Sequence, residues 1–361
     1  MGLLYRHFVK PLLFQFDAEK VHGFVVGVGE LVGKVYRGRP IDNSNLRQTI
    51  TGLNFPSPIG LAAGFDYQAS LTQVLPLLGF GFGTVGTITN QPFAGNPAPR
   101  LGRLPKSRSL MVNKGFKNLG AAATIKKLAP LHFAIPVGVS LGTRRSLDDL
   151  VSAFKKFEHS TVDNAYYELN ISCPNIAGGP NFYLPKNLEQ LLVAIDKLDI
   201  KKPLFVKMPI SQPNDAFLEM LTVISRHCPK GVIIGNLQKD RRHPSLDPAE
   251  VARFSVGYFS GKPTFDRSNE LISLAYKYFA QKLVIIGCGG VFSAQDAYEK
   301  IKRGASLVQL ITGLIFQGPQ LPSEINQGLI DLLAKDGYTN IHEAIGSRYI
   351  STMTGRIRGR R

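Results

Sequence analysis

Eight short runs rich in β-branched residues recur between residues 59 and 311, and each is followed by a stretch with helical periodicity. This alternation is typical of βα units, in which parallel strands share one sheet and the helices cover it. Eight such units in succession favour an α/β fold closed as a (β/α)8 TIM barrel over an open sheet. The predicted strands are 59–63, 82–87, 135–140, 167–171, 204–208, 232–236, 284–287 and 307–311.

The first 40 residues follow a different pattern. Aromatic and aliphatic side chains crowd the first segment, and Asp17 is placed to cap a second helix whose apolar residues from Val21 to Val35 share one face. We therefore expect three parts: an N-terminal pair of amphipathic helices over 1–40, the barrel over 41–346, and a basic tail over 347–361. The helix pair either packs on the barrel or lies in a membrane interface.

The composition narrows the range of partners. A net charge of +17 favours phosphates, lipid head groups or acidic substrates, although general proteome basicity has the same effect. The cysteines Cys173, Cys228 and Cys288 lack metal-ligand spacing, so we expect a reducing compartment and neither a metal site nor a disulfide framework. No apolar run reaches the ~18 residues of a membrane span, and no signal-peptide pattern is present. We expect no nucleic-acid partner.

Small and polar residues collect at the predicted strand ends, where TIM barrels place their chemistry. The seventh strand ends in Gly287-Cys-Gly-Gly290 and the eighth is followed by Thr312-Gly313. Glycine loops at these two places bind phosphate because backbone N–H groups can approach the oxygens. The alternative is that these glycines only make tight turns. The pattern predicts a phosphate site without identifying the molecule that bears the phosphate.

Two further strand ends suggest redox chemistry on a ring. Lys207 lies at the end of the fifth strand, where a buried charge needs a partner. That partner is either a flavin ring, which becomes negatively charged on reduction, or a neighbouring carboxylate that forms a salt bridge. The motif Asn170-Ile-Ser-Cys-Pro-Asn175 offers two amides to a planar ring. Its Cys173 is a candidate general base if its surroundings lower the thiol pKa, and otherwise an inert buried thiol.

These motifs, in this order, resemble dihydroorotate dehydrogenases of the quinone-linked class. The resemblance runs from about residue 5 to 346 and includes Phe14-Gln-Phe-Asp-Ala-Glu-Lys-Val-His22, Ile59-Gly-Leu-Ala-Ala-Gly-Phe-Asp66, Pro99-Arg-Leu-Gly-Arg-Leu104, Gly115-Phe-Lys-Asn-Leu-Gly120 and Ser260-Gly-Lys-Pro263. It implies oxidation of dihydroorotate in pyrimidine biosynthesis, with hydride transfer from C6 to FMN and removal of the C5 proton by a base. The electrons then go to a quinone, reached through the helix pair, at the cytoplasmic side of a membrane to which the protein binds peripherally.

The resemblance also implies roles for individual residues. Cys173 would be the base. Contacts to FMN would come from Ala63, Gly64, Thr87, Ser140, Asn170, Lys207, Gly235, Gly261, Gly290, Thr312 and Gly313. Contacts to the substrate would come from Tyr67, Asn113, Gly115, Phe116, Asn170, Asn175 and Asn236.

Several positions depart from the family pattern. Cys173 stands where quinone-linked members usually have serine, and Tyr67 stands where a lysine usually follows Asp66. Val112, Ser140 and Leu237 replace an asparagine, an asparagine and a threonine.

These changes remove polar contacts to the ring and its carboxylate, and such losses usually change the ligand of a buried site. A shift of the 112–116 loop by one residue would place Asn113 and Lys114 in the site and restore part of these contacts. The alternatives that stay open are FMN-dependent redox chemistry on a related ring and a flavin-binding paralogue without turnover. RNA modification by a dihydrouridine synthase is disfavoured because too little chain follows Gly346 for its RNA-binding domain.

Overall fold

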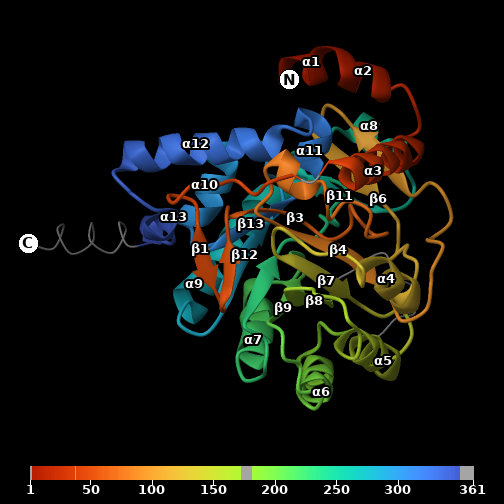
Figure 1. The fold of residues 1–361 in the computed structure, drawn as a ribbon, viewed down its shortest axis with the longest axis vertical. Helices are drawn as coiled ribbons and strands as arrows, with labels where there is room; N and C mark the ends of the chain where they lie inside the picture. The colour runs from red at the N-terminus through yellow and green to blue at the C-terminus, as the bar shows by residue number, and fades with distance from the viewer. Residues whose placement is uncertain (1, 37, 172–180, 350–361) are drawn as a thin grey trace, which may run out of the picture.

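The predicted barrel is confirmed. The computed structural model describes residues 2–36, 38–171 and 181–349. Eight parallel strands close on themselves, with the last pairing back to the first (Figure 1). In order around the barrel they are β3 (Ile59–Leu61), β4 (Phe82–Ile88), β7 (Val137–Leu141), β8 (Tyr166–Asn170), β9 (Leu204–Met208), β10 (Gly231–Ile234), β12 (Val284–Cys288) and β13 (Leu307–Leu310).

Amphipathic helices cover the outside of the barrel. In α5, for example, the Ser146 side chain accepts a hydrogen bond from Asp149 N, and Leu150, Phe154 and Phe157 turn one face to the core. The covering helices are α4 (Ala121–Leu128), α5 (Leu147–Glu158), α6 (Pro185–Asp196), α7 (Asn214–Ile224), α9 (Phe265–Phe279), α10 (Ala294–Lys302) and α12 (Leu321–Asp336). The loops also contain the short helices η2 (Leu75–Leu78), α8 (Pro248–Ala252), η3 (Lys262–Thr264), α11 (Thr312–Gln317) and α13 (Ile341–Ala344).

Aromatic rings close the end of the barrel at which the strands begin. Phe82 and Tyr166 fill it together with Phe55, which comes from a hairpin of β1 (Gln48–Ile50) and β2 (Leu53–Phe55). Room for the rings comes from glycines, since a Cβ on Gly60 would lie 2.3 Å from Phe82 Cζ and one on Gly138 2.1 Å from Tyr166 Cε2. Because side chains fill the amino ends of the strands, a ligand site can form only at their carboxyl ends.

A second, antiparallel sheet lies beside the carboxyl ends. It pairs β5 (Leu101–Leu104) with β6 (Ser109–Val112), and β6 with β11 (Tyr258–Gly261). The sequence patterns did not predict it, because each strand has four residues and β11 is far from β6 in the chain.

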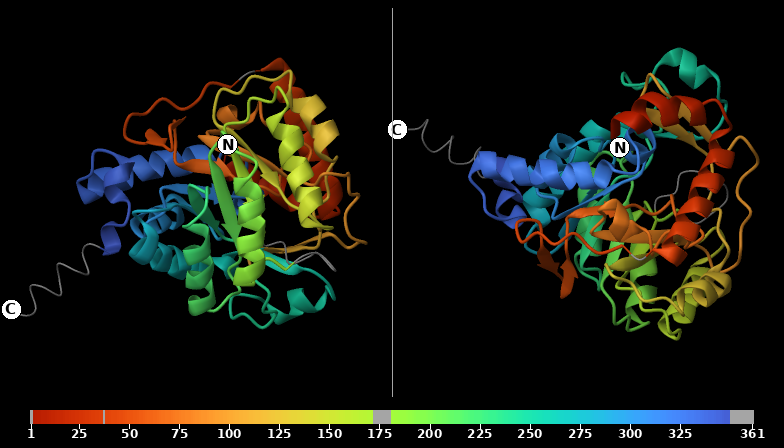
Figure 2. Two further views of the ribbon diagram at one scale, coloured as in Figure 1. Left: turned by 90° about the horizontal axis from the view of Figure 1, so that it is seen from below. Right: turned by 45° about the horizontal axis from the view of Figure 1, so that its top comes forward.

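The N-terminal helices lie together on one side of the molecule (Figures 1 and 2). A continuous helical segment of α1 (Gly2–Leu4), the π-helical η1 (Tyr5–Val9) and α2 (Lys10–Leu13) precedes α3 (Ala18–Val35). As predicted, Asp17 caps α3, and its carboxylate accepts hydrogen bonds from Glu19 N and Lys20 N. α3 packs against β5, and Glu19 pairs at 2.8 Å with both Arg100 and Lys117.

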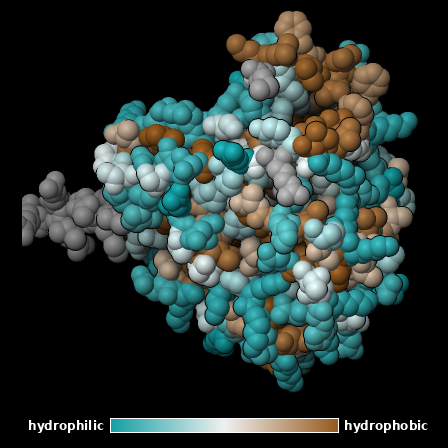
Figure 3. All heavy atoms as spheres, in the orientation of Figure 1, coloured by the Kyte–Doolittle hydropathy of each residue, from teal (hydrophilic) through white to brown (hydrophobic). Residues whose placement is uncertain are grey.

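Many apolar side chains of these helices face outward. Leu3 is 71% exposed, Phe8 69%, Phe24 66% and Val35 83%, and Figure 3 shows apolar residues gathered over this side. In the part of the chain that the structure describes, every helix is too short or too polar to cross a membrane.

Candidate active site

A glycine-lined cavity of about 100 Å³ lies at the ends of the last two barrel strands. Gly289 and Gly290 have φ of +105° and +73°, and a Cβ on Gly290 would lie 2.5 Å from Phe265 Cβ, so only glycine fits. Within the described residues, neither of these two backbone N–H groups donates a hydrogen bond. The predicted residues that line this cavity are Ala63, Lys207, Gly235, Asn236, Gly261, Gly290, Thr312 and Gly313.

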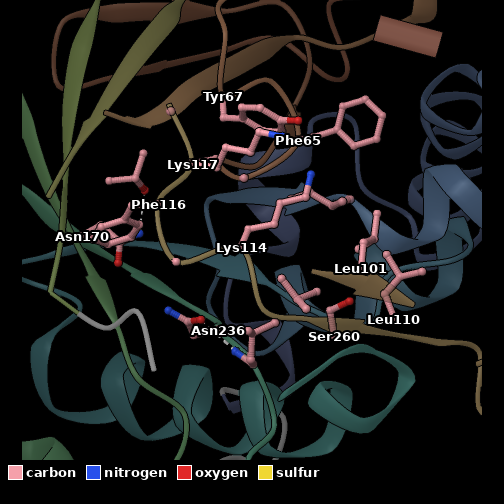
Figure 4. Close-up of a pocket in the computed structure, with 18 of the residues that line it drawn as sticks. Phe65, Tyr67, Leu101, Leu110, Lys114, Phe116, Lys117, Asn170, Asn236 and Ser260 are labelled. Atoms are coloured by element: carbon pink, nitrogen blue, oxygen red, sulfur yellow. Dashed lines mark hydrogen bonds between the residues drawn. The ribbon is translucent and has the colours of Figure 1, made fainter. Parts of the chain in front are cut away.

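A second cavity, of about 170 Å³, adjoins the first and shares the walls formed by Ala63, Lys207, Asn236 and Ser260. We call the two together the polar pocket. The predicted residues that line the second cavity are Ala63, Gly64, Tyr67, Thr87, Gly115, Phe116, Asn170, Lys207 and Asn236 (Figure 4). Residues from the ends of seven barrel strands, β3, β4, β8, β9, β10, β12 and β13, therefore meet in the polar pocket.

A buried hydrogen-bond network forms one wall of this pocket. Lys207 Nζ lies 3.4 Å from Glu168 Oε1, so the salt bridge that was one of two explanations for Lys207 is present. Ser140 Oγ donates to the same carboxylate oxygen at 2.6 Å and lies 2.9 Å from Thr87 Oγ1, and Asn170 Nδ2 donates to Thr87 Oγ1 at 2.8 Å. The salt bridge leaves Lys207 on the pocket wall, where the contact with a flavin stays a prediction. Ser140 lies behind Thr87 rather than on the cavity surface.

The loop after β6 alternates in direction. Val112 and Lys114 line the polar pocket, whereas Asn113 between them does not. The Asn113 side chain instead contacts Asn96 at 3.1 Å and Pro99 O at 3.4 Å. Neighbouring residues in an extended backbone point to opposite faces, so a loop that turns Lys114 inward must turn Asn113 outward. The structure therefore does not bring Asn113 into the pocket, and its contact with the substrate stays a prediction.

Aromatic rings form the roof of the pocket. The Tyr67 ring stacks on His22 with centroids 5.3 Å apart, and Lys114 Nζ lies 4.3 Å from the Tyr67 centroid. His22 Nε2 is 2.9 Å from Phe65 O. Burial, with a contribution from the Lys114 charge, lowers the pKa of His22 to about 3, so this imidazole is neutral near pH 7.

A separate apolar cavity of about 470 Å³ lies beneath the N-terminal helices. Its walls come from these helices, from η2 and from the barrel side of α11. We call it the apolar cavity. It meets the polar pocket at the residues that line both, which are His22, Phe65, Leu101, Leu110 and Ile315.

Some predicted residues stay untested and others were missed. Cys173 and Asn175 lie outside the described residues. Burial raises the pKa values of the thiols of Cys228 and Cys288, which suits the inert role expected for them. Glu168 was missed, although a carboxylate within an apolar strand was a usable signal. Among the described residues, no cluster of three His, Cys, Asp or Glu side chains has the geometry of a metal site.

A closed barrel with a glycine cradle and a polar pocket at its strand ends defines a cofactor-dependent TIM-barrel enzyme. The family model for dihydroorotate dehydrogenase matches residues 45–333, and the chain therefore belongs to this family. It is similar to the dihydroorotate dehydrogenase (quinone) of Natronomonas pharaonis, with 35% identity over 96% of this chain and 99% of that protein. It is also similar to the dihydroorotate dehydrogenase (quinone) of Brucella anthropi, with 36% identity over 94% and 95%.

Solved structures agree with these relatives. The DHODH of Eimeria tenella in complex with ferulenol superposes with a TM-score of 0.83 at 28% identity, over 92% of this chain and 96% of that chain. The resemblance to the quinone-linked class is thereby confirmed, as is the prediction of an oxidoreductase. Membership of the family also implies a flavin cofactor.

Proposed function

We propose that this protein oxidises dihydroorotate to orotate with FMN as its flavin and passes the electrons to a membrane quinone. The supporting observation is the contact between the two cavities. A polar pocket suited to an anionic ring adjoins an apolar cavity that opens among exposed apolar side chains. A flavin held in the polar pocket together with the substrate would have a lipid-soluble acceptor within reach through the residues that line both cavities.

The residues of the polar pocket fit FMN. The N–H groups of Gly289 and Gly290 would donate hydrogen bonds to the FMN phosphate. Ala63 and Gly64 would contact the flavin ring, and the Lys207 ammonium, paired with Glu168, would stabilise the negative charge that the ring gains on reduction. FMN, when bound, supplies the hydride acceptor.

The substrate would lie against the amides. Asn170 and Asn236 line the polar pocket from the ends of β8 and β10, and the resemblance adds Asn175. Cys173, three residues beyond Asn170, would remove the C5 proton, since a thiolate is a stronger base than a serine hydroxyl. A related ring substrate is the second candidate, because Tyr67, Val112 and Leu237 add apolar surface to the pocket where polar groups were expected.

The quinone would enter between the N-terminal helices. The lining of the apolar cavity is almost entirely carbon, which suits an isoprenoid tail, and exposed leucines and phenylalanines around it suit a peripheral contact with the cytoplasmic face of a membrane. Arg103, whose guanidinium lies 4.7 Å from the Phe14 ring, brings a cation to this apolar wall.

The purified full-length protein tests the proposal. We expect noncovalent FMN, bleaching of its absorbance by dihydroorotate, and reoxidation by quinone. Colourless protein that ignores added FMN would contradict the cofactor. Flavin that stays oxidised at saturating dihydroorotate would favour the related ring substrate.

Membrane binding has its own test. Leu31→Ser/Val35→Ser removes two exposed apolar side chains from α3, and we expect weaker binding to anionic phospholipid vesicles. Leu184→Ser/Val193→Ser removes two exposed side chains at the start of α6 and within it, and serves as the matched control. Equal loss in both variants would argue against a specific membrane face.

A further inference from the structure

Four basic side chains line the polar pocket, and three of them are already engaged. Lys207 pairs with Glu168 at 3.4 Å, and Lys117 pairs with Glu19 at 2.8 Å. The third is His22, whose Nε2 lies 2.9 Å from Phe65 O. Lys114 is the remaining basic side chain, and its ammonium has spare hydrogen-bonding capacity.

Lys114 is buried, with 9% of its surface exposed. Within the described ranges 2–36, 38–171 and 181–349, its ammonium makes neither a hydrogen bond nor an ion pair. Lys114 Nζ lies over the face of the Tyr67 ring, 4.3 Å from the ring centroid. Figure 4 shows the side chain crossing the pocket, with the ammonium directed towards Tyr67 and Phe65. A buried ammonium without an acceptor is costly, so an anionic ligand would stabilise it. The same burial lowers the pKa of Lys114 to about 7.

The loop that carries Lys114 is held firmly. Gly115 and Phe116 both have φ near +65°, and a Cβ on Gly115 would lie 2.4 Å from Asn96 Oδ1. Lys114 O accepts a hydrogen bond from Asn96 N at 3.2 Å, and Asn118 Nδ2 donates to Phe116 O at 2.8 Å. Because both sides of the loop are tied, the inward direction of Lys114 is built into the fold.

We propose that the ammonium of Lys114 binds the carboxylate of the substrate and so determines the preference of this pocket for a carboxylated ring. The inference rests on the proposed function and deepens it. The amides of Asn170 and Asn236 take the polar edge of the ring, and Lys114 takes its negative charge at the Tyr67 end of the pocket. Lys114 thus supplies a cation from the loop after β6, while the loop after β3 contributes the Tyr67 ring against which that cation rests.

Titration of the flavin absorbance with orotate tests the proposal on the FMN-loaded full chain. Lys114→Met keeps the length of the side chain and removes the charge. We expect orotate affinity to fall about ten- to a hundredfold, as for loss of one charge-assisted hydrogen bond. FMN content and the flavin midpoint potential should not change. Uracil, the same ring without the carboxylate, should bind both proteins equally.

Two further variants sharpen the result. Lys117→Met removes the same charge from a neighbouring lysine that is paired with Glu19, and it should change orotate affinity much less. Lys114→Met/Tyr67→Lys returns an ammonium to the same end of the pocket, and it should regain part of the lost affinity.

The outcomes separate this inference from the proposed function. Wild-type protein that binds FMN but not orotate would contradict the proposed substrate. Wild-type protein and Lys114→Met that bind orotate equally would overturn the role of Lys114 alone. A shifted flavin potential with unchanged orotate affinity would assign Lys114 to the flavin instead.

Discussion

The polar pocket and the apolar cavity adjoin each other but are built in different ways. The polar pocket is made at strand ends, where backbone geometry and polar side chains form the walls beneath an aromatic roof. The apolar cavity is made by the faces of helices around a volume of about 470 Å³. The polar pocket requires particular residues at particular positions, whereas the apolar cavity requires only apolar residues that leave a space between them. Single substitutions in the polar pocket should therefore reduce activity strongly, whereas substitutions in the apolar cavity should reduce it by small steps.

The largest effect is expected at Cys173. Cys173→Ala removes the proposed base and should slow flavin reduction by dihydroorotate about a hundred- to ten-thousandfold while FMN stays bound. Cys173→Ser should keep some activity, with its optimum moved to higher pH, because a hydroxyl is the weaker acid. Stopped-flow measurement of flavin bleaching tests both variants. Unchanged kinetics in the alanine variant would remove Cys173 from the mechanism.

The next effect concerns the buried Lys207–Glu168 pair in the wall of the polar pocket. Lys207→Met leaves the Glu168 carboxylate buried without its cation, and we expect stability to fall by about 3–5 kcal/mol together with weaker FMN binding. Lys207→Met/Glu168→Gln removes both charges and should regain much of the stability without restoring the rate of flavin reduction. Denaturant unfolding and flavin release measure the two effects. Equal stability of the two variants would show that the pair is not coupled.

The barrel and the pocket differ in how far the sequence could predict them. Alternating periodicity placed all eight strands within about two residues; β7 begins two residues late, where Pro136 cannot donate to the ladder. Glycines and amides at strand ends predicted the pocket because strand ends must converge. The sheet of β5, β6 and β11 was missed because its pairing is non-local.

Side-chain direction was the other limit. Asn113 and Lys114 are adjacent in the sequence, and only a tied loop decides which one faces the ligand. Glu168 was missed for a related reason, since its partners Ser140 and Lys207 come from neighbouring strands. Empty volume in the apolar cavity has no sequence signal at all, because its lining residues are of the types that usually fill a core.

The cavity side of the comparison is tested by truncation. Deleting residues 1–40 removes one wall of the apolar cavity and His22 from the roof of the polar pocket, but little of the core, since within this segment only Val26 belongs to the main cluster of described buried residues. We expect a folded, flavin-loaded barrel that reduces a short water-soluble quinone normally and a long-chain quinone about tenfold more slowly, as for loss of a kcal/mol or two of apolar contact. Equal rates with both quinones would make the helices structural.

The pH dependence of ligand binding tests the charge of the pocket. Orotate should prefer protonated Lys114, whose pKa in the free protein is lowered to about 7 by burial. Affinity should therefore be constant below pH 7 and fall by up to about tenfold per unit above it. The titratable and charged groups around this ammonium are Glu19, His22, Tyr67, Arg100 and Lys117.

Glu19, His22 and Tyr67 do not predict the same curve. Glu19 is held ionised by its two cations, which lower its pKa, and His22 is neutral over this range. Burial raises the pKa of Tyr67 above its ordinary value, out of the range tested. Lys114→Met should therefore give an orotate affinity that is flat with pH. Parallel curves for the wild type and this variant would assign the titration to another group.

The smallest effect is expected at Val112, which ends β6 on the wall of the polar pocket. Val112→Asn offers the ring one more amide, and a net hydrogen bond of about 0.5–1.5 kcal/mol would lower the KM for dihydroorotate roughly two- to tenfold. Tyr67→Lys should gain less on its own, because it removes the stack on His22 and places a second ammonium beside Lys114. Asn113→Ala is the matched control, since its side chain contacts Asn96 and Pro99 outside the pocket and its loss should leave KM unchanged. A raised KM in the control would mean that Asn113 turns inward when the ligand binds, and an unchanged KM in Val112→Asn would mean that the ring does not reach the end of β6.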